Sequence, residues 1–171
     1  MHSIAWWPTL FAVSVATVSD LRTRRIPNWL VLPFLLAGLT VSGLTGGWHG
    51  FGRSVLGASL GAAMLGIFYL AGGMGMGDVK LLASIGAWVG PLQLAFAFLF
   101  MGLAGGLMAL AWAIRGGFLA DWIGNTGDLI FGVARGLRAP AGLTLANPRG
   151  RKMPYAPAIA IGTILSFLAL L

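Results

Sequence analysis

The chain has 171 residues, of which 58% are hydrophobic and only 9% are charged, with 11 Lys and Arg, four Asp and no Glu. So few charges cannot cover a soluble domain of this length, and lipid is therefore expected to cover much of the surface. The net charge of +7 comes from basic residues in short stretches between apolar segments, which argues against a nucleic-acid partner, and the absence of cysteine excludes disulfides, thiolate nucleophiles and cysteine metal sites.

Apolar stretches account for most of the sequence. A helix that crosses about 30 Å of hydrocarbon needs about 20 apolar residues. Six candidates follow along the chain: 3–19, 28–45, 54–73, 79–90, 92–114 and 154–171. The sequence therefore predicts an all-α polytopic membrane bundle of about six transmembrane helices, forming a single membrane-embedded domain over residues 1–171.

The first span is apolar from Ile4 but has no basic segment before it and no signal-peptidase cleavage site. We therefore expect it to be retained and not removed as a signal peptide. Asp20 ends this span. As an isolated residue it is explained well enough as an interfacial carboxylate that solvates a helix end.

Two pairs of glycines lie four residues apart on one helical face: Gly57 with Gly61, and Gly102 with Gly106. This spacing lets two helix backbones approach closely. We interpret both pairs as packing positions.

Asp78 opens the short fourth span and follows the glycines of GGMGMGD at 72–78. On its own it is explained by an N-cap role at the start of the fourth helix. The glycines Gly75 and Gly77 permit a close backbone approach, such as that of a substrate. Lys80 lies two residues further on, a spacing that does not predict an ion pair with Asp78.

Pro91 separates the fourth and fifth spans, because proline lacks the N–H donor of a helix interior; alternatively, 78–114 forms one bent hairpin. The polar segment at about 115–152 is then expected as a cytoplasmic loop. Within it, 128–138 has the pattern of an amphipathic surface helix, and a plain loop explains it equally well. Asp121 and Asp128 lie in this loop and need no special explanation.

The basic residues predict the orientation. Ten lie in the first, third and fifth loops, against one, Arg53, in the opposite loops. By the positive-inside rule, both termini lie outside the cytoplasm. The ten are Arg22, Arg24, Arg25, Lys80, Arg115, Arg135, Arg138, Arg149, Arg151 and Lys152. This topology independently places Asp20 and Asp78 at the same cytoplasmic boundary.

Carboxylates close to lipid are costly and are usually functional. Two carboxylates that lie close together share one proton, so one can act as a base on water while the other acts as an acid on a carbonyl oxygen. We therefore interpret Asp20 and Asp78 as the working pair of an intramembrane aspartyl protease. No cofactor or metal is expected, because two histidines are too few for a histidine-rich metal site and two aspartates suffice to activate water.

Three stretches, in order, carry a resemblance to a known family: Asp20 with R-x-R-R-I-P-N at 22–28, G-M-G-D-V-K-L at 75–81, and P-Y-A-P-A-I-A-I-G at 154–162. The chain resembles the type IV prepilin peptidases, members of the GxGD intramembrane aspartyl proteases. It is most similar to the short peptidase-only type of tight-adherence (Flp) pilus systems.

The resemblance implies that Asp20 and Asp78 are the catalytic aspartates and that Gly75 and Gly77 belong to the active-site loop, near Lys80. It implies an aspartic endopeptidase of the bacterial inner membrane that removes the leader peptide from prepilins at the cytoplasmic face. Longer family members also N-methylate the pilin and have a cysteine-bearing insertion. This chain has no cysteine, so we expect no methyltransferase activity.

Two other classes of function stay open at this point. A small transporter usually has ionisable residues near the bilayer midplane, and this sequence has none there. The second of these classes is a non-catalytic membrane subunit of a pilus or secretion assembly. The identity of the prepilin and the oligomeric state do not follow from the sequence.

Overall fold

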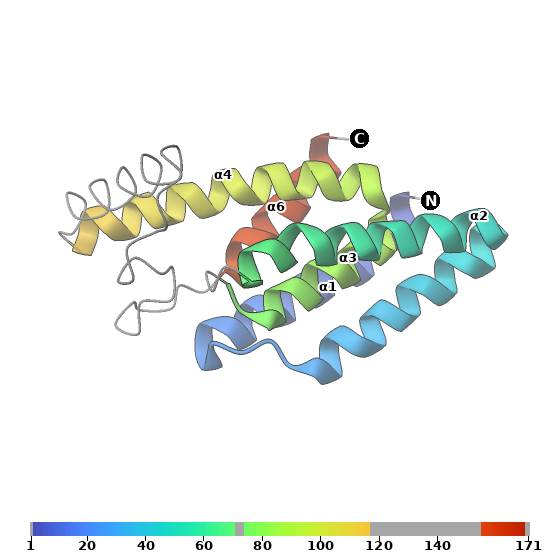
Figure 1. Ribbon diagram of the computed structural model, residues 1–171, viewed down its shortest axis with the longest axis horizontal. Helices are drawn as coiled ribbons and strands as arrows, with labels where there is room; N and C mark the ends of the chain where they lie inside the picture. Colours follow the sequence, from blue (N-terminus) through green and yellow to red (C-terminus); the bar gives the residue numbers. More distant parts are fainter. Residues whose placement is uncertain (1, 71–73, 117–154, 170–171) are drawn as a thin grey trace.

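The computed structural model describes residues 2–70, 74–116 and 155–169, and within these ranges every element is an α-helix. The elements are α1 (His2–Thr23), α2 (Asn28–Leu70), α3 (Met76–Val89), α4 (Pro91–Gly116) and α6 (Ala156–Ala169) (Figure 1). The all-α prediction is therefore confirmed for the described part of the chain. The expected surface helix at 128–138, with Asp121 and Asp128, lies outside the described residues.

Helix α2 contains two of the expected spans, 28–45 and 54–73. It is interrupted at Gly47, which has φ 57° and ψ −146°, a conformation that residues with a side chain rarely adopt. The chain reverses direction there, so an arm at 28–46 and an arm at 48–70 meet at the right of Figure 1 and diverge toward the left. At this reversal a side chain on Gly50 would collide with the carbonyl oxygen of Ser42. The turn is thus tighter than the eight-residue connection expected from hydropathy.

Helix α3 lies at the centre of the bundle and packs mainly against α2. Leu81, Leu82 and Ile85 are completely buried. At 14 residues, the helix is about 21 Å long, shorter than the hydrocarbon core of a bilayer. Because α3 is buried among other helices, it does not need the roughly 20 apolar residues of a helix that faces lipid along its whole length.

Glycines allow the close approach of α2 and α3. A Cβ atom on Gly57 would overlap the carbonyl oxygen of Gly86, and a Cβ atom on Gly86 would overlap that of Gly57. On the next turn of α2, a Cβ on Gly61 would lie 2.7 Å from the carbonyl oxygen of Leu82. The packing role predicted for Gly57 and Gly61 is therefore confirmed.

The packing role predicted for Gly102 and Gly106 is wrong within the described ranges. Both residues are exposed on α4, and a Cβ on either would meet no atom within 4 Å. Helix α6 packs on a different face of α4, where Gly162 approaches the backbone of Ala97 and Met101. The spacing identified a smooth helical face correctly, but it could not show which face of α4 is covered.

Large apolar side chains cover much of the outside of the described bundle, as expected for a surface in contact with lipid. By length and apolar composition, Asn28–Leu70 and Pro91–Ala111 are able to cross a membrane, and Ala156–Ala169 is apolar but shorter. Among the most exposed large side chains are Trp7, Leu44, Trp48, Ile67, Leu70, Leu92 and Leu107.

Candidate active site

The C-terminal end of α1 and the N-terminal ends of α3 and α6 lie at the same end of the bundle, at the left of Figure 1. These ends carry the three motifs that are far apart in the sequence. Asp20 comes from the first motif and Asp78 from the second, and the side chains are 7% and 8% exposed. The fold therefore buries both predicted aspartates at one end of the molecule.

Asp20 lies in the last turn of α1, which continues to Thr23 and not only to residue 19. Arg24 then adopts a left-handed conformation with φ 51°, and its N–H donates to the Asp20 carbonyl oxygen at 2.8 Å, which ends the helix. The Asp20 carboxylate points to another element: its Oδ2 accepts a buried hydrogen bond of 3.1 Å from the backbone N–H of Ala156. Asp20 is thus more than a carboxylate that solvates a helix end.

The connection from α1 to α2 contacts the second motif. A Cβ atom on Gly77 would lie 3.1 Å from the Cβ of Ile26, so the two residues are in close contact. The ammonium group of Lys80 donates a hydrogen bond of 3.2 Å to Oδ1 of Asn28. The start of α3 is therefore held against the segment that follows Asp20 by two contacts. Gly77 packs against Ile26, and Lys80 donates to the side-chain amide of Asn28.

Asp78 lies in the first turn of α3, and the N-cap is Gly75, with extended backbone angles of φ −82° and ψ 147°. The interpretation of Asp78 as the N-cap is therefore wrong. The backbone N–H of Asp78 donates to the Gly75 carbonyl oxygen at 3.2 Å. A Cβ atom on Gly75 would lie only 3.3 Å from Asp78 Oδ2, so the missing side chain at Gly75 leaves room for the carboxyl group.

The two carboxyl groups act on each other electrostatically. Asp78 precedes the span expected at 79–90, and burial raises the pKa of its carboxyl from 3.8 to about 6, with the negative charge of Asp20 as the second cause. Backbone N–H groups of Gly75 and of Asp78 itself act in the opposite direction. A carboxyl group whose pKa is raised in this way keeps its proton to a higher pH than a free aspartate and can act as a general acid.

The start of α6 is the part of the site that sequence reasoning missed. Besides the Ala156 N–H, which binds Asp20, the Ala156 carbonyl oxygen accepts a hydrogen bond of 3.4 Å from Thr17 Oγ1 of α1. Tyr155, just before α6, is half-buried. The available signal was the third motif, whose position at the start of a helix predicts free N–H donors.

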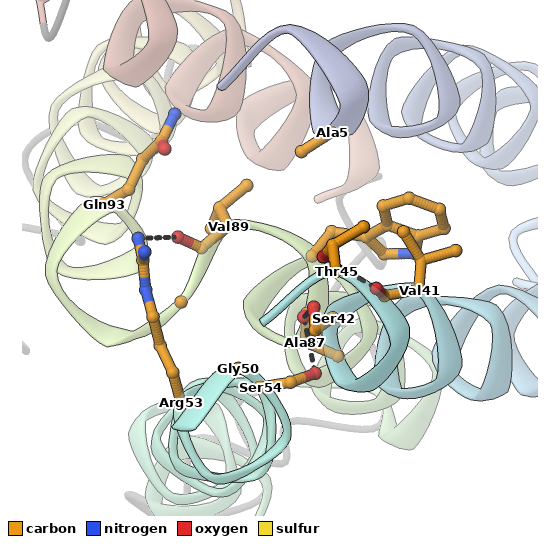
Figure 2. A pocket seen from close by; sticks show the side chains of 12 residues that line it. Ala5, Val41, Ser42, Thr45, Gly50, Arg53, Ser54, Ala87, Val89 and Gln93 are labelled. Carbon is orange, nitrogen blue, oxygen red and sulfur yellow. Dashed lines mark hydrogen bonds between the residues drawn. The ribbon is translucent and has the colours of Figure 1, made fainter. Parts of the chain in front are cut away.

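A polar pocket lies at the opposite end of the bundle, where α3 ends and the two arms of α2 meet (Figure 2). Its cavity volume is about 50 Å³. Arg53 donates to the carbonyl oxygen of Val89 at 3.1 Å, and Ser54 donates to that of Ala87 at 2.6 Å. No carboxylate lines this pocket. Its hydrogen bonds satisfy carbonyl groups at the end of α3, so we interpret it as a structural anchor for that helix.

Within the described residues, no three His, Asp, Glu or Cys side chains gather as ligands for a metal ion. This end of the bundle carries the buried Asp20 and Asp78 carboxyl groups and the Ala156 N–H that donates to Asp20. The arrangement can polarise a water molecule and protonate a carbonyl oxygen.

Comparisons with known proteins agree on one family. The model of the type IV leader peptidase family matches residues 7–110. A prepilin leader peptidase/N-methyltransferase of Aeromonas hydrophila is 37% identical over 117 residues, which cover 61% of this chain and 40% of that protein. The protein of the same name from Bacillus subtilis is 33% identical over 174 residues, which cover 97% of this chain and 57% of that protein. No solved structure matches the chain.

The chain thus spans about half the length of the curated relatives it matches. The match to residues 7–110 includes both aspartates and the glycines between them, and the Bacillus relative extends the similarity over almost the whole chain.

Proposed function

The chain belongs to the type IV leader peptidase family, and from this membership we propose that it is an intramembrane aspartyl endopeptidase that removes the leader peptide from prepilins. The observation that carries the proposal is the burial of Asp20 and Asp78 at one end of the bundle, where the charge of one acts on the other. The relatives that it resembles are named prepilin leader peptidases.

Asp20 and Asp78 are the catalytic residues in this proposal. The ionised carboxylate takes a proton from a water molecule as the water oxygen attacks the scissile carbonyl carbon. The protonated carboxyl donates its proton to the carbonyl oxygen, which gives a tetrahedral intermediate. As the C–N bond breaks, the first carboxyl gives the proton that it took from water to the leaving nitrogen, and the second carboxylate takes a proton back from a hydroxyl of the intermediate. One water molecule is consumed and neither aspartate changes its net protonation over the cycle.

Gly75, Gly77 and Lys80 support this pair. Gly75 leaves room for the Asp78 carboxyl, Gly77 allows Ile26 to pack against the start of α3, and Lys80 bonds to Asn28. The expected effect of these contacts is to hold the start of α3 at a fixed distance from the end of α1.

The finer features of topology and location also belong to the proposal. The chain forms one membrane-embedded domain over 1–171 with about six spans, of which the two arms of α2 are the second and third. The site faces the cytoplasm at the bacterial inner membrane, with prepilin as substrate and lipid around the bundle. The basic residues Arg22, Arg24 and Arg25 next to Asp20 support this orientation.

The narrower subtype is the peptidase-only form of tight-adherence (Flp) systems, which cleaves the prepilin without methylating it. The absence of cysteine supports this subtype.

The direct test is to incubate the purified full chain in detergent or liposomes with an Flp-type prepilin and to sequence the products by mass spectrometry. We expect a single cut that releases the leader just before the hydrophobic helix of the pilin. An intact prepilin after incubation with folded protein would contradict the proposal and would favour a non-catalytic membrane subunit.

A further inference from the structure

The connection between α1 and α2 consists of residues 24–27, and hydrogen bonds fix both of its ends. At its start, the Arg24 N–H donates to the Asp20 carbonyl oxygen at 2.8 Å. At its end, the Pro27 carbonyl oxygen accepts the N–H of Leu30 at 3.2 Å, where α2 begins. The connection is therefore a defined turn whose position is tied to both helices.

Two hydroxyl groups of α1 hold the middle of this turn. Ser19 Oγ donates to the Arg25 carbonyl oxygen at 2.8 Å, and Thr23 Oγ1 approaches the same oxygen at 3.4 Å. Thr23 Oγ1 also donates to the Ser19 carbonyl oxygen at 2.9 Å, the usual partner of a helical threonine hydroxyl. Because a hydroxyl has one proton to donate, Thr23 shares it between two acceptors, and Ser19 makes the stronger bond to the turn.

The same turn contacts the residue that precedes the second aspartate. Ile26 packs against Gly77, where a Cβ atom would lie 3.1 Å from the Ile26 Cβ. Gly77 immediately precedes Asp78 in α3. On the other helix, Ser19 immediately precedes Asp20. A short series of direct contacts through the turn therefore joins the backbone at one aspartate to the backbone at the other.

We propose that the turn at 24–27 is the spacer that sets the separation of Asp20 and Asp78, and that Ser19 is a positioning residue whose hydroxyl holds this spacer in place. The inference rests on the proposed peptidase function. It extends that function by adding a residue that acts on the carboxyl groups only through the turn.

The expected effect follows from the bonds that remain when the Ser19 hydroxyl is removed. The Arg25 carbonyl oxygen then keeps only the longer contact with Thr23, and Ile26 can shift relative to Gly77. A misplacement of about 1 Å can cost about 100-fold in rate, so a shift of a few tenths of an ångström should lower kcat about three- to tenfold. Because the reacting groups are displaced and the substrate-binding surface is not, KM should stay within about twofold.

Three serine variants of the full chain test the role of the hydroxyl. Ser19→Ala removes it, and Ser19→Thr keeps it and should retain a kcat within about twofold of the wild type. Ser14→Ala is the matched control, because Ser14 lies on the same helix with an exposed side chain, further from the turn. The kcat and KM of prepilin cleavage and the thermal unfolding of each variant are measured in the same detergent. Alanine is a better helix former than serine, so Ser19→Ala should unfold close to the wild-type temperature.

The wild type separates the two levels of the account. If it cleaves and Ser19→Ala retains a kcat within about twofold of Ser14→Ala, the role of Ser19 is refuted while the peptidase function stands. The role is also refuted if Ser19→Thr is as slow as Ser19→Ala, if KM alone rises, or if loss of folded protein accounts for the lost rate. If the folded wild type does not cleave, the proposed function fails and this inference fails with it.

Discussion

Gly75→Ala is the substitution for which the structure predicts a loss of activity without a loss of fold. The added methyl carbon would lie 3.3 Å from Asp78 Oδ2, a contact tight enough for the carboxyl to shift by a few tenths of an ångström. The backbone angles of Gly75, φ −82° and ψ 147°, are open to alanine. The strain therefore falls on the carboxyl group and not on the main chain.

The size of the effect follows from that shift. Misplacing a reacting group by about 1 Å can cost about 100-fold in rate, so a few tenths of an ångström should lower kcat/KM about three- to tenfold. The stability should fall by about 1 kcal/mol, because glycine is preferred over alanine at an N-cap position, which leaves the protein folded. Cleavage of prepilin by the purified variant measures the first quantity, and thermal unfolding in the same detergent measures the second.

Gly66→Ala is the matched control. A Cβ at Gly66 meets no atom within 4 Å, and Gly66 lies inside the second arm of α2, where alanine is favoured by up to about 1 kcal/mol. We expect this variant to keep wild-type activity and to unfold at an equal or higher temperature. Equal activity of the Gly75 and Gly66 variants would show that the Asp78 carboxyl does not depend on the space at Gly75, which would refute the reasoning.

Three further predictions concern orientation, pH and product. Reporter fusions at Arg25, Gly77 and Arg138 should all report the cytoplasm, because ten of eleven basic residues lie in the loops of one side; a periplasmic signal at Gly77 would contradict the shared site. Because the pKa of Asp78 is raised to about 6, its acid form is lost as the pH rises through that value, so kcat/KM should fall above about pH 6. A profile that is flat from about pH 5 to about pH 9 would count against this assignment. Pilin processed by this protein as the only peptidase should carry an unmethylated N-terminus, and a methyl mass increment on it would contradict the peptidase-only subtype.

The sequence predicted helix boundaries and helix contacts well where the hydropathy pattern agrees with the positions of proline and glycine. Pro91 lies where α3 gives way to α4, and the Gly57 and Gly61 pair lies where α2 meets α3. The connection between the second and third spans was predicted at 46–53, which includes Gly47 but is too broad, because hydropathy is averaged over many residues whereas the turn depends on one residue with a positive φ. Gly102 and Gly106 show the related limit: a helical face can be identified from spacing, but its neighbour cannot.

The candidate site could be predicted in its ionisable groups but not in the hydrogen bonds that hold them. Asp20 and Asp78 stood out because carboxylates are rare in this chain. The bond from Ala156 to Asp20 joins a backbone N–H to a residue 136 positions away, and a backbone donor has no signature in the side-chain pattern. The pairing of Lys80 with Asn28 likewise depends on the return of the chain after the left-handed Arg24.

The central claim, that two aspartates perform the cleavage, is tested most directly by Asp20→Asn and Asp78→Asn. Asparagine keeps the size of the side chain but cannot exchange a proton, so each variant should accumulate in the membrane at normal levels and leave prepilin uncut. We expect cleavage to fall at least about 1,000-fold in each, and the double variant to be hardly worse, since members of a catalytic unit are strongly non-additive. Asp121→Asn and Asp128→Asn, which change the loop carboxylates, should retain most activity. Substantial cleavage by either the Asp20 or the Asp78 variant at a normal protein level would contradict the aspartyl-protease mechanism.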